Sequence, residues 1–179
     1  MKRNQKIREL AAMAVIAALY AALCYVFAFI SYGPFQSRVA EILLVHIVYN
    51  KKYCIPIILG TFIANMYSPL GPVDMLLGTL ATVLGCAVII LVKSGALKKI
   101  LAAPAAAVSN GVIVGLMLYY FDPDIAGLAL WYLMSTVAVG EFIIVLAGVL
   151  VFAGIEKMNP KFISIIKNIG LENRGEKIG

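Results

Sequence analysis

Charged residues are scarce in this sequence of 179 residues, and most of it lacks long polar stretches. Aspartate, glutamate, lysine and arginine make up 13% of the chain, well below the roughly 25% of an average soluble domain. Hydrophobic residues make up 63%, more than a water-soluble core of this size can hide. The composition excludes an ordinary soluble domain and predicts an all-α protein that crosses a membrane several times.

Motifs of common enzymatic chemistry are also missing. There is no GxxxxGK[ST] phosphate loop, no HExxH, no GxSxG and no cluster of histidine or cysteine ligands. Cys24, Cys54 and Cys86 lie in or beside apolar runs, and we expect them to be small buried hydrophobes. We therefore expect no catalytic residue, no metal and no cofactor, and we do not expect an enzyme.

Six apolar segments can be drawn, and they are Ile7–Ile30, Val39–Asn50, Cys54–Met66, Val73–Val92, Leu97–Phe121 and Ala126–Ile155. The first is too long for a signal peptide and has no clear cleavage site. The second and third are shorter than the ~20 residues of a full span, so their length also allows a re-entrant element.

The placement of basic residues favours six crossings. If the N-terminus is cytoplasmic and all six segments cross, 14 of the 15 lysines and arginines lie on the cytoplasmic side. Arg38 is the sole exception. The sequence therefore predicts a multi-pass protein of the cell membrane with both termini in the cytoplasm, and the net charge of +6 is a topology signal that gives little support to nucleic-acid binding.

Two parts follow from this pattern: a six-helix transmembrane domain over residues 1–156 and a cytoplasmic tail over residues 157–179. After Pro160, isoleucines alternate with Lys161 and Lys167, which predicts a short helix on the inner leaflet. The last apolar segment exceeds the bilayer thickness, so we expect Ala126–Tyr132 to lie at or near the outer surface.

Polar side chains inside membrane segments are rare and mark functional sites by default. The candidates are Arg38, Glu41, His46, Asn65, Asp74, Asn110 and Glu141. All but His46 and Asn110 fall near the outer ends of their segments, which predicts an outward-opening pocket for a small polar ligand. We expect His46 to be a hydrogen-bonded helix residue in the inner half.

Three of these residues have alternative interpretations. Arg38 and Glu41 are three apart and share a helix face, so they either form an ion pair with each other or bind a ligand. Glu141 has no cation in its own helix. Unless Arg38 reaches it, Glu141 is expected to be protonated or occupied by a ligand donor.

The first segment carries alanines at four-residue spacing, Ala14, Ala18 and Ala22. Such a strip allows another helix to approach closely. It serves either internal packing or docking to a separate membrane subunit.

Several stretches together resemble the QueT family of queuosine-precursor transporters. They are SYGPFQSRVAE at 31–41, GTFIANMYSPLG at 60–71, Asp74, GTLAT at 78–82, Ser109-Asn110-Gly111 and Gly140-Glu141. The resemblance implies a substrate-binding S component of an energy-coupling factor (ECF) transporter, a six-helix bundle without its own ATPase. It also implies that the alanine strip contacts a transmembrane coupling subunit and that a pair of cytoplasmic ATPases drives transport. The implied ligand is a 7-deazaguanine. 7-Cyano- or 7-aminomethyl-7-deazaguanine and queuine belong to this class.

The chemistry of such a ligand suits the candidate residues. A carboxylate, Glu41 or Glu141, can accept from N1–H and the exocyclic amine together. Arg38, Gln36 or an asparagine (Asn65 or Asn110) can donate to O6. Asp74 suits a cationic aminomethyl group, and a ring near the outer face, Tyr32 or Trp131, can stack on the base.

Two other functions stay open at this point. One is an S component for another flat heterocycle, such as a pterin or a thiamine precursor. The other is a small membrane enzyme that uses Glu41, Asp74 and Glu141 as acid and base.

Overall fold

The computed structural model describes residues 2–32, 37–125 and 127–169, and all the regular structure in these ranges is helical. The elements are α1 (Lys2–Val26), α2 (Ala28–Ser31), η1 (Val39–Leu44), α3 (Val45–Tyr49), η2 (Lys51–Tyr53), α4 (Cys54–Asn65), α5 (Pro72–Leu91), α6 (Gly95–Phe121), η3 (Pro123–Ile125), α7 (Leu130–Met158) and α8 (Pro160–Asn168), where η marks a 3-10 helix. The all-α prediction is therefore confirmed.

Four helices are long and apolar enough to cross a membrane: Lys6–Val26, Pro72–Leu91, Gly95–Phe121 and Leu130–Met158. The two short predicted segments are helical as well, but α4 has 12 residues, about 18 Å of helix. They do not reach the length of a full span. Six crossings thus remain a prediction.

The first predicted segment contains a break. Helix α1 ends at Val26, and Phe27, with φ −103° and ψ 34°, separates it from α2. The last segment begins as a helix at Leu130 and not at 126, since Ala129 is still extended. The helix predicted after Pro160 is present as α8, where the Asn159 side chain accepts from the backbone N–H of Phe162 at 3.2 Å.

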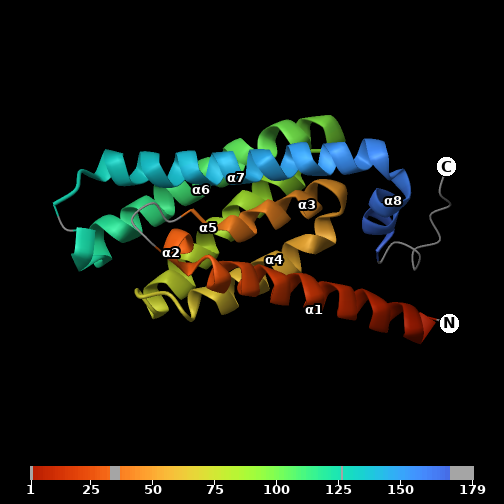
Figure 1. Ribbon diagram of the computed structural model, residues 1–179, viewed down its shortest axis with the longest axis horizontal. Helices are drawn as coiled ribbons and strands as arrows, with labels where there is room; N and C mark the ends of the chain where they lie inside the picture. The colour runs from red at the N-terminus through yellow and green to blue at the C-terminus, as the bar shows by residue number, and fades with distance from the viewer. Residues whose placement is uncertain (1, 33–36, 126, 170–179) are drawn as a thin grey trace.

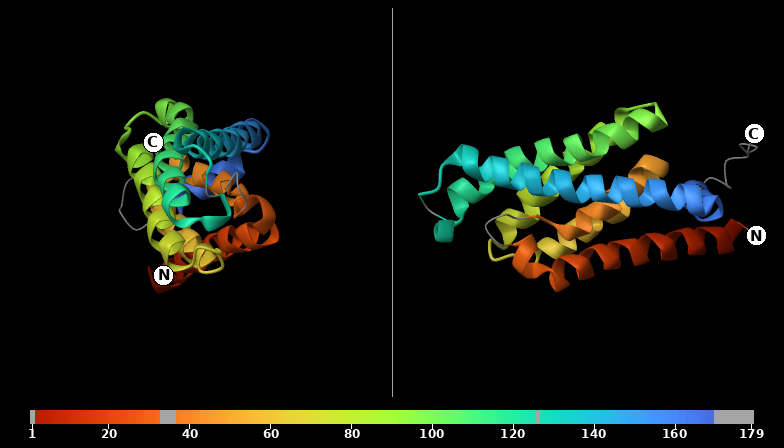
Figure 2. Two further views of the ribbon diagram at one scale, coloured as in Figure 1. Left: turned by 90° about the vertical axis from the view of Figure 1, so that its left-hand side faces the viewer. Right: turned by 45° about the horizontal axis from the view of Figure 1, so that its top comes forward.

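A short helical stretch, η1 followed by α3, occupies the centre of the bundle. Helices α6 and α7 run side by side, α5 packs on α6, and α1 packs on α4 (Figures 1 and 2). The η1–α3 stretch contacts α1, α5, α6 and α7, and Ala40, Leu44, Val45 and Ile47 are almost wholly buried. A segment so enclosed presents its polar side chains to the protein and not to lipid.

Glycines let the long helices approach each other closely. A Cβ added at Gly111 would lie 2.7 Å from the Ala138 Cβ, and one at Gly115 would lie 2.7 Å from the Met134 side chain. Because the contact positions run in opposite directions along the chain, α6 and α7 are antiparallel. A similar approach at Gly60 lets α4 lie against Ala17 and Tyr20 of α1.

Apart from Arg38, the basic residues with recorded ion pairs lie at one end of the molecule, where Figure 1 shows the start of α1 and α8. Glu156 of α7 accepts from Lys99 at 2.5 Å and from Lys167 of α8 at 2.9 Å, and Lys52 pairs with Glu9 at 2.5 Å. The turns that follow α4 and α6 lie at the other end (Figure 1). The charge asymmetry that the sequence predicts is therefore an asymmetry between the two ends of the bundle.

Two smaller predictions also hold. His46 is buried and its Nδ1 lies 2.8 Å from the carbonyl oxygen of Leu43, with Phe152 and Tyr53 edge-on to the ring. The three cysteines are free thiols; Cys24 and Cys86 are fully buried in the core as expected, whereas Cys54 is only partly buried. Within the described residues, no group of histidine, cysteine and acidic side chains could hold a metal.

Candidate functional site

An ion pair between two distant parts of the chain forms the centre of the site. The Arg38 guanidinium, which directly precedes η1, places Nη2 2.8 Å from Asp74 Oδ1, and both side chains are at most 1% exposed. Asp74 lies in the first turn of α5, where Gly71 at φ 53° makes the turn and Pro72 begins the helix. A carboxylate at this position also interacts favourably with the helix dipole.

This pair corrects one interpretation of the sequence. Arg38 was expected either to pair with Glu41 or to contact a ligand, because the two residues are three apart. In the structure η1 is a 3-10 helix that begins just after Arg38, and the guanidinium extends to α5. Among the described residues, Asp74 is the carboxylate that forms its ion pair.

Glu141 reaches the same region from α7. The backbone N–H of Arg38 donates to Glu141 Oε1 at 3.2 Å, and Oε2 has no partner. The neighbouring Gly140 makes this possible, because a Cβ there would collide with the Ser37 hydroxyl. Arg38 thus does reach Glu141, through a hydrogen bond from its backbone and not through an ion pair with its guanidinium.

Glu41 is held by two residues that the sequence analysis missed. The Tyr20 hydroxyl of α1 donates to Glu41 Oε1 at 2.7 Å, and the Thr82 hydroxyl of α5 lies 3.4 Å from the same oxygen. Tyr20 is the one aromatic residue in the apolar stretch 9–24, and a buried tyrosine hydroxyl needs a partner. Thr82 follows Asp74 and Gly78 at four-residue spacing, so one face of α5 carries all three.

Asn65 and Gly78 complete the cluster. The Asn65 side chain donates to the backbone oxygen of Asp74 at 2.9 Å, which links the end of α4 to the start of α5. A Cβ at Gly78 would lie 2.5 Å from Arg38 Nη2 and 2.8 Å from Asn65 Nδ2. Gly78 therefore leaves the space in which the guanidinium sits.

We call Tyr20, Arg38, Glu41, Asn65, Asp74, Gly78, Thr82 and Glu141 the polar cluster. It brings together side chains from α1, α4, α5, α7 and the segment around η1, near the end of the bundle opposite the lysines. The polar side chains among them are almost completely buried. Several still have atoms without any partner: Arg38 Nε, Glu41 Oε2, Asn65 Oδ1, Asp74 Oδ2 and Glu141 Oε2.

Buried polar atoms without a hydrogen-bond partner destabilise a protein. Each of the three carboxyl groups uses one oxygen and leaves the other free. A small molecule that donates hydrogen bonds would satisfy these atoms.

Asn110 lies beside this cluster without a contact to it that the structure records. Its Nδ2 donates to Ala106 in its own helix at 3.2 Å, and its Oδ1 is buried without a partner. Because Gly111 faces Ala138, Asn110 of α6 lies within one turn of the level of Glu141.

The predicted aromatic residues are not joined to the cluster. Tyr32 is half-buried and its hydroxyl donates to the backbone oxygen of Ala64 at 2.6 Å, so it fixes the end of α4. Trp131 is 71% exposed and packs edge-on against Tyr132. Gln36, the remaining predicted ligand residue, lies outside the described residues.

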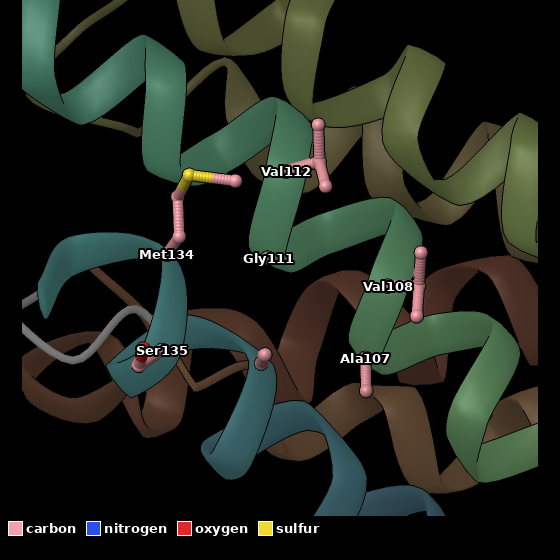
Figure 3. Close-up of a pocket in the computed structure, with 7 residues that line it drawn as sticks. Ala107, Val108, Gly111, Val112, Met134 and Ser135 are labelled. Carbon is pink, nitrogen blue, oxygen red and sulfur yellow. The ribbon is translucent and has the colours of Figure 1, made fainter. Parts of the chain in front are cut away.

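A groove between α6 and α7 has a different character. Figure 3 shows Val108 and Val112 on α6 and Met134 and Ser135 on α7 along it. Its only side-chain polar group, the Ser135 hydroxyl, donates to the backbone oxygen of Trp131 at 2.6 Å. The groove is apolar and shares no residue with the polar cluster.

The alanine strip of α1 faces outward. Ala14, Ala18 and Ala22 are exposed, whereas the contact with α4 uses Ala17 and Tyr20 on the opposite face. Internal packing of the bundle therefore explains Ala17, which lies beside the strip, but not Ala14, Ala18 and Ala22.

Comparison with known proteins gives the family. A sequence model of the QueT transporter family matches residues 10–157, a range that contains the whole polar cluster. A protein of Lactococcus lactis subsp. cremoris (strain MG1363) described as queuosine precursor transporter QueT is 38% identical over 82 residues. That alignment covers 45% of this chain and 48% of the relative, so the chain matches about half of the length of the relative. No solved structure matches the chain. Because the family model covers most of the sequence, the chain belongs to the QueT transporter family.

Proposed function

We propose that this protein binds a queuosine precursor of the 7-deazaguanine class and is the substrate-binding S component of an ECF transporter. The observation that carries the proposal is the polar cluster, in which three buried carboxyl groups around Arg38 each keep one oxygen free. The family and the description of the Lactococcus relative support the ligand class.

The free atoms match the polar edge of a deazaguanine. N1–H and the exocyclic amine of the ligand are adjacent donors, and a carboxylate accepts such a pair in a bidentate manner. Glu41 Oε2 and Glu141 Oε2 are available for this. Arg38 Nε is the free donor that can bind O6 of the ligand, while its Nη2 stays with Asp74.

The proposed topology has six crossings with both termini in the cytoplasm. The basic end of the bundle, with Lys52, Lys99 and Lys167, faces inward under the positive-inside rule. The polar cluster then lies toward the outside, where a precursor is captured. α8 lies along the inner leaflet in this arrangement, with Phe162 and Ile165 exposed beside Lys161.

An S component needs partner subunits for transport, and the outward-facing alanines offer a contact surface for one of them. Small side chains let a second helix approach closely within a bilayer, and Ala14, Ala18 and Ala22 present such a surface. We assign this face to the transmembrane coupling subunit, with a cytoplasmic ATPase pair supplying the energy. The chain itself is assigned no catalytic role.

A ligand panel tests the proposal. The purified chain in lipid nanodiscs is heated with 7-deazaguanines, a pterin, a thiamine precursor or no ligand, and unfolding is followed. We expect the 7-deazaguanines alone to raise Tm. Stabilisation by a pterin or thiamine precursor without any response to a 7-deazaguanine would overturn the ligand class, and product formation by the purified chain would favour the membrane enzyme.

A further inference from the structure

The free atoms of the buried region are mostly acceptors. Among the described residues, eight buried side-chain atoms lack a partner, and five of them are amide or carboxyl oxygens: Glu41 Oε2, Asn65 Oδ1, Asp74 Oδ2, Asn110 Oδ1 and Glu141 Oε2. Amide oxygens and ionised carboxylates only accept. Arg38 Nε can only donate, and the hydroxyls of Ser31 and Thr79 can do either. A ligand that satisfies this set has to bring more donors than acceptors.

The ionisable groups of the polar cluster are also unequal in number. Arg38 is the one cationic side chain of the polar cluster, and it faces three carboxyl groups. The recorded ion pairs of the lysines, Lys52, Lys99 and Lys167, lie at the other end of the bundle. A buried carboxyl group without a cation beside it stays neutral. A ligand with a positive charge would let one of these groups ionise, and a neutral ligand would not.

The three carboxyl groups differ in how far the protein satisfies them. Asp74 has the Arg38 guanidinium at 2.8 Å, and Glu41 Oε1 has the hydroxyls of Tyr20 and Thr82. From the residues that the structure describes, Glu141 receives only a backbone N–H, at 3.2 Å. A cation placed next to Asp74 would also be repelled by Arg38. Glu141 is therefore the carboxyl group best placed to bind a positive charge on a ligand.

We propose that the site selects a cationic 7-deazaguanine, one with a protonated amine on its 7-substituent, and that Glu141 is the residue that selects it. This inference rests on the proposed function. The ammonium group brings three donors and a charge to the acceptor-rich cluster. A nitrile in its place adds an acceptor where acceptors are already in excess, and a hydroxymethyl group has similar size without the charge. In this arrangement Glu41 binds the guanine edge of the ligand.

Calorimetric titration of the full chain in nanodiscs tests the inference with three ligands: 7-aminomethyl-, 7-hydroxymethyl- and 7-cyano-7-deazaguanine. We expect the aminomethyl compound to bind about tenfold tighter or more than the other two, because a hydrogen bond to a charged partner is stronger than a neutral one. In Glu141→Gln that preference should fall to near one. In Glu41→Gln all three affinities should fall by a similar factor, which keeps the preference.

The matched control is Glu156→Gln, a carboxylate of the same helix at the lysine end, which should leave all three affinities unchanged. Equal binding of the three ligands to the unaltered protein would overturn the inference and leave the proposed function standing. A preference that survives in Glu141→Gln would overturn the role of Glu141. Binding of none of the three ligands would instead overturn the proposed function. If Glu141→Gln does not fold, the comparison of ligands on the unaltered protein still decides whether the site selects a cation.

Discussion

Arg38 and Asp74 form a fully buried ion pair, with 2.8 Å between Nη2 and Oδ1, that joins the entry to η1 with the first turn of α5. Each of the two charges is compensated largely by the other. Removal of one partner leaves an uncompensated buried charge, which is far more destabilising than the pair itself is stabilising.

Arg38→Met should therefore lower the free energy of unfolding by about 3–5 kcal/mol and abolish ligand binding. Thermal unfolding in detergent and calorimetry measure the two effects. The matched control is Lys52→Gln, which breaks the half-exposed pair with Glu9 at the other end of the bundle. That loss should stay below about 1 kcal/mol, and intact binding in Arg38→Met would contradict the site.

Gly78→Ala should disrupt the same pair without removing a charge. The new Cβ would lie 2.5 Å from Arg38 Nη2 and would collide with the Asp74 carboxylate as well. We expect weaker ligand binding and a lower Tm, although alanine is the better helix former by about 1 kcal/mol.

The control for Gly78→Ala is Gly154→Ala in α7, where a Cβ would meet nothing within 4 Å. That substitution should leave binding unchanged and keep or raise Tm. If the two alanine variants have the same ligand affinity and the same Tm, the close contact at Gly78 is not required for binding or stability.

Tyr20→Phe should weaken ligand binding through Glu41. The substitution removes the donor at 2.7 Å from Glu41 Oε1 and keeps the packing of the ring. Loss of a hydrogen bond to a buried charged group corresponds to about 1–3 kcal/mol, or roughly tenfold to a hundredfold in Kd. Calorimetry on this variant and on Tyr119→Phe, whose ring is 47% exposed on α6, gives the comparison. If the Kd is unchanged in Tyr20→Phe, Glu41 does not bind the ligand as proposed.

Ala18→Trp should separate binding from transport. The large side chain would project from the exposed strip of α1 and hold a partner helix away, while the polar cluster stays intact. We expect normal ligand affinity in the purified chain and loss of uptake in cells that also carry the coupling subunit and ATPases. Leu80→Trp, at a 45% exposed position of α5, is the control and should transport normally. Normal uptake by Ala18→Trp would place the partner elsewhere.

Much of the polar cluster is predictable because ionisable side chains are rare in membrane helices. Arg38, Glu41, Asn65, Asp74 and Glu141 stand out against an apolar sequence, and the structure brings them together. Their partners are not predictable in the same way. Sequence spacing ranks Glu41 as the neighbour of Arg38, but the backbone enters η1 at that point and the guanidinium turns to α5.

The residues that sequence analysis missed are those with a polar atom on an otherwise apolar or small side chain. Tyr20 and Thr82 attract no attention in a hydrophobic helix until a carboxylate is found opposite them. Trp131 is 71% exposed, as expected for an aromatic residue with an interfacial role, and its stacking on a ligand stays a prediction. The bounds of η1 and α3 together, 39–49, agree with the predicted segment, whereas their almost complete burial comes from packing in the bundle and not from local sequence.

The members of the polar cluster come from α1, α4, α5, α7 and the segment before η1, so no fragment of the chain contains the site. Any molecule held there makes contacts that exist only when the first and last long helices are both in place. Ligand binding to the cluster and the folding stability of the bundle are then thermodynamically linked. Free ligand at concentration [L] raises the free energy of unfolding by RT ln(1 + [L]/Kd). A chain of this kind is held together more firmly when it carries its cargo than when it is empty.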